Sequence, residues 1–532
     1  MTRLLIIFGF LAPSLLLGQY GNEWIDYSQK YYEIPIVETG VYRIDSTTLA
    51  SVLAQTGDDL SAIDPRNLQL IGRDQELYIH VEGESDGVFN ASDFLLFYAK
   101  KNDTWLDSNL FDNPDLLLNK EKSFTSDTIR YFLTWNNSIN NRRVKQETDT
   151  DFSGYSSADY CWKTNKSTYH QEYFIGDQHE GLSRSKYEQA EGWAALRFAM
   201  GASHSAAIST ANAYYGSGAP AANVEAVSAG ASNASTSLSF NHKLIVSYTN
   251  ASGSQIDVVD TTYFGYKVIR SLFTIPNSDI PATTSTIKHR SENLGQPSDY
   301  QTVGEVIVSY PHTFDFESTS WFDFSLEASI DPKQVLSITN FGASAPKLWL
   351  FSGDTIKDLA IVNSGASLDV LVPNNSAGTT QKLIMFDLNA TRSVAASGSS
   401  GAVIRPVLGR GTFRDLAALN LDSAFIIVTH KSLMAEAKTY GAYRSSTAGG
   451  GFDTVVIDID ELYRQFGGGV VKSGIGIRRF CYYAIDNWPT QPSNLFLIGK
   501  SVMEASEGNA AVLSTVTWGI VEGLYDLSLI HI

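Results

Sequence analysis

Three short apolar runs stand out between residues 424 and 500, separated by two segments whose apolar residues recur at helical spacing. The runs cover residues 425–428, 454–459 and 495–498, and each is continuous and rich in β-branched residues. Such runs are typical of strands buried on both faces of a parallel sheet. The segments between them are long enough for crossover helices. The pattern therefore predicts the start of a doubly wound α/β sheet.

The helices of this unit can be placed from the same pattern. The first is expected to begin near Lys431, the second covers 460–466 and ends at three glycines, and the third runs near 473–488. In the third helix, four residues fall at intervals of four, three and four and should pack on the sheet: Ile477, Cys481, Ala484 and Trp488.

The chain ahead of this unit has the pattern of β structure. Residues 24–49 and 68–81 alternate apolar with polar residues and contain turn signals, which predicts hairpins in an N-terminal β domain, 19–160. Residues 161–404 are rich in small and polar residues with short strands at irregular spacing, as in one or two β-sandwiches. Their aromatic residues either fill cores or form a sugar-stacking face; the core interpretation is favoured. We expect a multidomain chain, all-β and then α/β from residue 405.

Charge and the apolar run at the N-terminus limit the classes of function and the location that the chain can have. The net charge of the 532 residues is −18, and no basic stripe is visible, which argues against nucleic-acid binding. Residues 1–18 carry Arg3 and an apolar run from 4 to 17, which predicts a secretory signal cleaved after Gly18. The run is shorter than the roughly 20 residues that span a bilayer, and no later run is longer. The mature chain is therefore expected to be secreted or at the cell surface, without a spanning segment.

Two cysteines, Cys161 and Cys481, are the candidate nucleophiles. They are too few for a disulfide framework. A catalytic thiolate needs an exposed position and a neighbouring His. Cys481 lies mid-helix on the expected buried face, and Cys161 lies in a polar β region. His430 follows the first parallel strand, at the edge where such sheets bind ligands, but a helix-start role is favoured over catalysis.

Two further motifs are weaker. Residues 498–501 read IGKS, but Asn494 stands where a phosphate-binding loop needs glycine, so nucleotide binding is rejected. Asp86, Asn90 and Asp93, around Gly87, could offer oxygen ligands to Ca²⁺, although a turn with solvated acids is favoured. We predict no catalytic, cofactor-binding or other metal residue.

The stretch from residue 422, with FDTVVIDIDELYRQFGGGV, YAIDNW and NLFLIGK in that order, resembles the opening of the catalytic domain in gingipain-type cysteine peptidases. GVYRID, DGVFNASDFLLFYA and YFLTW are similar to the β region ahead of that domain in secreted members, including the type IX secretion sortase. The resemblance implies a caspase-like fold, a Cys–His dyad, and protein or peptide substrates, with secretion-system or cell-surface components as further partners. In the family the dyad lies beyond the position of Ile498. No catalytic residue can therefore be carried over.

The last residues, 527–532, read LSLIHI, which is what a common sequencing adapter encodes when read through. We expect a non-native tail, an α/β domain (405–526) that is incomplete, and a chain that is inactive as it stands. The alternative is a non-enzymatic surface protein whose β-sandwiches bind glycan or protein, or a scaffold that has lost the dyad.

Overall fold

The computed structural model describes residues 20–111, 113–176, 189–399, 401–419 and 421–499. The expected signal peptide, residues 1–18, and the expected non-native tail lie outside these ranges. No helix of the described part is long and apolar enough to cross a membrane.

The N-terminal region consists of two sheets that share one apolar core with the helix α1 (Ser46–Leu53). The first sheet has the order β28 (Arg405–Pro406), β1 (Tyr32–Ile36), β7 (Ile129–Trp135), β3 (Leu68–Gly72) and β4 (Gln75–Glu76). The second has the order β27 (Arg392–Ser393), β2 (Gly40–Asp45), β6 (Phe94–Ala99) and β5 (Ile79–Val81). The chain thus returns, through β27 and β28, to the sheets it began with.

A ten-stranded sheet organises the next region. Its order is β17 (Val268–Ile275), β14 (Ala222–Gly230), β19 (Tyr300–His312), β9 (Cys161–Thr168), β20 (Trp321–Glu327), β26 (Thr380–Asp387), β22 (Pro346–Ser352), β23 (Thr355–Leu359) and β8 (Lys145–Glu147), with β12 (Phe198–Ala199) on β19. Its two halves meet between β9 and β20, where Trp162 pairs with Ser325.

Each half of the long sheet is covered by a smaller one. The half around β14 and β19 shares a core with β13 (Ser203–Ser209), β18 (Thr284–Ser291), β15 (His242–Thr249) and β16 (Gln255–Tyr263). The half around β20 and β26 shares another core with β21 (Lys333–Ile338), β25 (Leu368–Pro373) and β24 (Ile361–Asn363). A separate hairpin pairs β10 (Glu172–Ile175) with β11 (Glu191–Ala194).

The C-terminal unit is a three-stranded parallel sheet in the order β30 (Thr454–Asp458), β29 (Phe425–Thr429) and β31 (Asn494–Ile498). The helix α2 (Met434–Ser445) shares a small core with one face of β29, while α3 (Ile459–Gln465) and α4 (Ile475–Asn487) share a larger core with the other. Helices on both faces define the doubly wound arrangement that the sequence predicted.

Local details of this unit also agree with the sequence, with one exception. The side chains of Ile477, Cys481, Ala484 and Trp488 are all buried along α4. Ile459, expected to end the second strand, instead begins α3. The cause is Asp458, whose carboxylate accepts the backbone N–H of Asp460 at 3.0 Å and so caps the helix.

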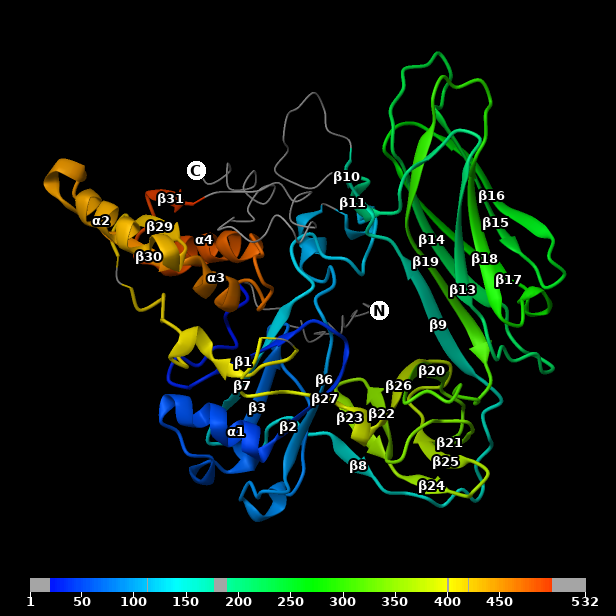
Figure 1. Cartoon of the computed structure of the whole chain (residues 1–532), viewed down its shortest axis with the longest axis horizontal. Helices are drawn as coiled ribbons and strands as arrows, with labels where there is room; N and C mark the ends of the chain where they lie inside the picture. Colours follow the sequence, from blue (N-terminus) through cyan, green and yellow to red (C-terminus); the bar gives the residue numbers. More distant parts are fainter. Residues whose placement is uncertain (1–19, 112, 177–188, 400, 420, 500–532) are drawn as a thin grey trace, which may run out of the picture.

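The parallel unit sits against the N-terminal sheets, opposite the strands β13 to β19 (Figure 1). The backbone N–H of Arg130 in β7 donates to the carbonyl of Gly469 at 2.9 Å, and the N–H of Val471 donates to Thr128. Val470 is fully buried in the N-terminal core. The segment after α3 therefore joins the two regions into one body.

Candidate functional site

All three strands of the parallel sheet end at the same edge, which is where ligands bind in sheets of this class. Thr429, Asp458 and Ile498 are in register there, and the Thr429 hydroxyl donates to the carbonyl of Ile498 at 3.1 Å. This edge is the candidate functional site of the described chain.

His430 lies at this edge, directly after β29. Its Nδ1 accepts the backbone N–H of Ser432 at 3.2 Å and lies 2.8 Å from the Ser432 hydroxyl, so the ring caps the short helical turn 431–433. The ring therefore has the helix-start role that the sequence favoured over catalysis.

Asp458 is the neighbouring acid, and the sequence pattern did not single it out. Burial raises the pKa of its half-buried carboxyl, and the hydrogen bond from the backbone N–H of Asp460 opposes that rise. The signal was available, because an acid that directly follows a buried parallel strand lies at the ligand edge. His430 and Asp458 can hold or orient a substrate here, but neither supplies the thiolate that a cysteine peptidase needs.

Cys481 lies in the middle of α4, within the core shared with β29, and is only 5% exposed. Burial raises the pKa of its thiol to about 12. A thiol in such surroundings stays protonated and inert. The structure thus agrees with the prediction that Cys481 is a core residue.

Cys161 is fully buried at the start of β9, directly opposite His312 of β19. Its thiol lies 3.6 Å from the backbone carbonyl of His312. Burial raises the pKa of this thiol well above its ordinary value. Cys161 and His312 are neighbours in the sheet, but they pack as an ordinary pair of opposed strand residues and not as a catalytic pair.

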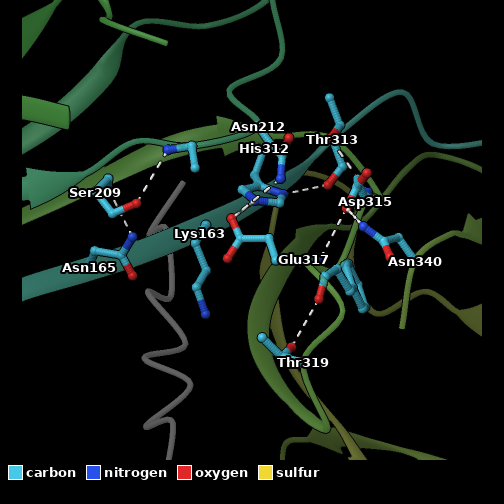
Figure 2. A network of polar contacts seen from close by, with 12 residues as sticks. Lys163, Asn165, Ser209, Asn212, His312, Thr313, Asp315, Glu317, Thr319 and Asn340 are labelled. Carbon is cyan, nitrogen blue, oxygen red and sulfur yellow. Dashed lines mark hydrogen bonds and ion pairs between the residues drawn. The ribbon is translucent and has the colours of Figure 1, made fainter. Parts of the chain in front are cut away.

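The His312 imidazole belongs to a polar network at the joint between the two halves of the long sheet (Figure 2). Its Nε2 lies 3.4 Å from the Glu317 carboxylate, which also accepts from the Asn212 amide, and its Nδ1 faces the carbonyl of Thr313 at 2.5 Å. Asn212, Glu317 and Asn340 have positive φ angles, as the tight loops of this joint require. The network fixes the path from β19 to β20.

The calcium candidates do come together, but mainly as parts of a turn. The Asp86 carboxylate accepts the N–H of Val88 at 2.9 Å and the Asn90 amide at 3.1 Å. The Asp93 carboxylate accepts the backbone N–H of Asn90 at 2.7 Å. Within the described residues, no group of three or more His, Cys, Asp or Glu is placed to hold a metal. Calcium binding by Asp86, Asn90 and Asp93 stays a prediction that the structure does not test.

The IGKS motif is described only in part. Ile498 ends β31 and Gly499 follows it, whereas residues 500 and 501 fall outside the described ranges.

Comparison with known proteins finds a family match over the parallel unit. Residues 419–521 match the model of Peptidase family C25. Among solved structures, the chain is similar to dimeric latent PorU from Porphyromonas gingivalis, with a TM-score of 0.57 and 14% sequence identity. The alignment covers 93% of this chain and 44% of that chain, so this chain spans less than half of the PorU structure. At this identity the match shows a shared fold.

Some matches to solved structures are far weaker. Xylanase 10C from Cellvibrio japonicus aligns with a TM-score of 0.16 and 12% identity, over 32% of this chain and 30% of that chain, which is too little to bear on fold or function. No curated protein matches the chain. The family match and the shared fold confirm the resemblance drawn from the sequence: residues 419–521 match peptidase family C25, and the chain shares the fold of latent PorU.

Proposed function

We propose that this chain is the N-terminal part of an exported, gingipain-type cysteine peptidase, and that it acts on protein or peptide substrates. The Cys–His dyad is contributed by gene sequence that continues after the codon for Asp526. The observation that carries the proposal is the peptidase family C25 match, which falls on the doubly wound unit from its first strand onward.

The state of the two cysteines supports a missing nucleophile. The chain has two, and both are buried with thiol pKa values raised by burial. Covalent catalysis by cysteine requires an exposed thiolate activated by a neighbouring base. Neither Cys161 nor Cys481 can attack a peptide carbonyl without unfolding its surroundings.

In the reaction that we propose, the missing thiolate forms an acyl-enzyme and the dyad histidine moves the proton. Hydrolysis of that intermediate gives a peptidase, whereas attack by an amine gives a sortase-like transpeptidase. The shared fold with PorU keeps both outcomes open. In either case the edge formed by Thr429, His430 and Asp458 lies where the substrate is expected.

Activity assays on two forms of the protein test the proposal. The 532-residue chain and the product of the complete gene are each incubated with a fluorogenic peptide library, with and without iodoacetamide. The complete product should cleave peptides in a thiol-dependent manner, and the 532-residue chain should not. Iodoacetamide-sensitive cleavage by the 532-residue chain would show that one of its own cysteines is catalytic.

Export and the signal peptide rest on residues 1–18 alone and are part of the same proposal. Amino-terminal sequencing of the mature protein should give Gln19 as the first residue. A mature protein that begins at Met1 would contradict cleavage.

A further inference from the structure

Two histidines face each other across neighbouring strands, far from the parallel sheet. His204 of β13 lies directly opposite His289 of β18. Alternation along the strands puts His204 on the same face as Ala206, and His289 on the same face as Ile287, both of which are fully buried. The Cβ atoms of residues opposed in this way lie about 4.5–5.5 Å apart. Both imidazoles therefore enter the core from the same face.

Three of the four ring nitrogens of this pair are buried without a hydrogen-bond partner in the described part of the chain. His289 is completely buried, and neither its Nδ1 nor its Nε2 bonds to any residue of the described part of the chain. The buried Nε2 of His204 is in the same state. A buried polar atom without a partner destabilises the folded state, so three of them on two opposed residues call for a bound water or ion.

The surroundings of the pair favour a metal ion of a particular kind. Val246 lies on the other side of His289, and the ring of Tyr169 meets the ring of His204 edge-on at 4.6 Å. No Asp or Glu of the described residues joins the two histidines in a metal-binding group.

We propose that His204 and His289 form a two-imidazole site for a transition-metal dication, with water in the remaining coordination positions. Nitrogen ligands without carboxylates suit Zn²⁺, Ni²⁺ and Cu²⁺ and disfavour Mg²⁺ and Ca²⁺. His204 is only partly buried, so the ion enters from that side. The bound ion ties β13 to β18 and stabilises this half of the β region. The site is independent of the peptidase proposal.

Metal analysis of the untagged chain tests the site. The protein is treated with chelator, dialysed against Zn²⁺, Ni²⁺ or Mg²⁺, and assayed for bound metal and for Tm. We expect one Zn²⁺ or Ni²⁺ per chain, a higher Tm with either ion, and no binding of Mg²⁺. His289→Gln and His204→Gln should each lose stoichiometric binding. His170→Gln changes an exposed histidine of the same region and should keep it.

The Cu²⁺ form gives a readout that does not depend on how stable the variants are. Its electron paramagnetic resonance spectrum should show coupling to two imidazole nitrogens in the native chain and to one in His204→Gln. Absence of a retained ion, equal loss in His170→Gln, or a spectrum without nitrogen coupling would each overturn the proposal and leave a bridging water as the partner of the pair.

Discussion

Glu33 of β1 and Arg464 of α3 form a buried ion pair, although 431 residues separate them along the chain. The Arg464 Nη2 donates to Glu33 Oε1 at 3.0 Å, and the Arg130 Nε lies 3.4 Å from the same carboxylate. Burial, followed by the positive charge of Arg464, lowers the pKa of Arg130 to about 10. One carboxylate thus holds two guanidinium groups where the parallel unit meets the N-terminal sheets.

Removal of one partner of this pair should destabilise the protein strongly. Arg464→Met leaves the buried Glu33 with less compensation, and the loss of one partner of a buried pair costs about 3–5 kcal/mol. Urea unfolding measures the change. Lys166→Met is the matched control, because the pair of Lys166 with Glu121 is exposed and should contribute less than about 1 kcal/mol. Equal effects of the two changes would show that the Glu33 pair does not hold the junction.

The glycine turn after α3 should tolerate no side chain. Gly469 has a φ of +76°, and a Cβ there would lie 2.5 Å from the carbonyl oxygen of Arg130. Gly451 has a similar φ of +66° but open space around it. Gly451→Ala should cost about 1–2 kcal/mol from backbone strain alone, and Gly469→Ala clearly more. Thermal unfolding of the two variants separates the steric clash at Gly469 from the backbone strain that both share. A Gly469→Ala variant no less stable than Gly451→Ala would contradict the predicted clash.

Both native thiols should be inert. Because Cys161 and Cys481 are buried, dithionitrobenzoate should label neither in the folded protein and both in guanidinium chloride. The measurement is the absorbance of released thionitrobenzoate over time. Rapid labelling of Cys481 in the folded state would mean that α4 does not pack as described and would reopen that residue as a nucleophile.

Asp107 should make stability fall between about pH 4 and pH 6. Burial raises the pKa of its carboxyl to about 6, so the folded state holds a proton that the unfolded state releases near the ordinary pKa of 3.8. Stability from this group is fully present below pH 3.8 and is lost as the pH rises through 6. The loss amounts to roughly 2–3 kcal/mol.

Urea unfolding at several pH values checks this sign. Asp107→Asn should flatten the fall, because the amide cannot ionise, while Asp115→Asn, at an exposed position nearby, should leave it unchanged. If the stability of the wild-type protein rose between pH 4 and 6 as much as that of Asp107→Asn, the raised pKa of Asp107 would be contradicted.

The parallel unit was the part most open to prediction from sequence. Its strands are continuous β-branched runs, and the spacing from Ile477 to Trp488 marks the buried face of α4, because local periodicity reports directly on burial. The edge position of His430 followed from the same strands. The multidomain, β-rich fold class was predicted for the same reason.

Other relationships leave no local signal. Arg392 and Arg405 begin short strands that pair with β2 and β1, more than three hundred residues earlier, and nothing in their sequence specifies that return. The pairing of Glu33 with Arg464 is of the same kind. The domain boundaries drawn at residues 160 and 404 therefore stay predictions. For the pair of His204 and His289, the sequence indicates only that the His204 side chain points inward, because it alternates with Ala206 and Ile208.

We propose that this chain is the N-terminal part of a peptidase whose nucleophile lies further on. Sequencing of the gene beyond the codon for Asp526 tests this proposal most directly. We predict an open reading frame that replaces LSLIHI and continues through further apolar, β-branched runs, with a His and a Cys at the ends of successive strands. A stop codon at that point, or a continuation that encodes no such His and Cys, would contradict the peptidase account.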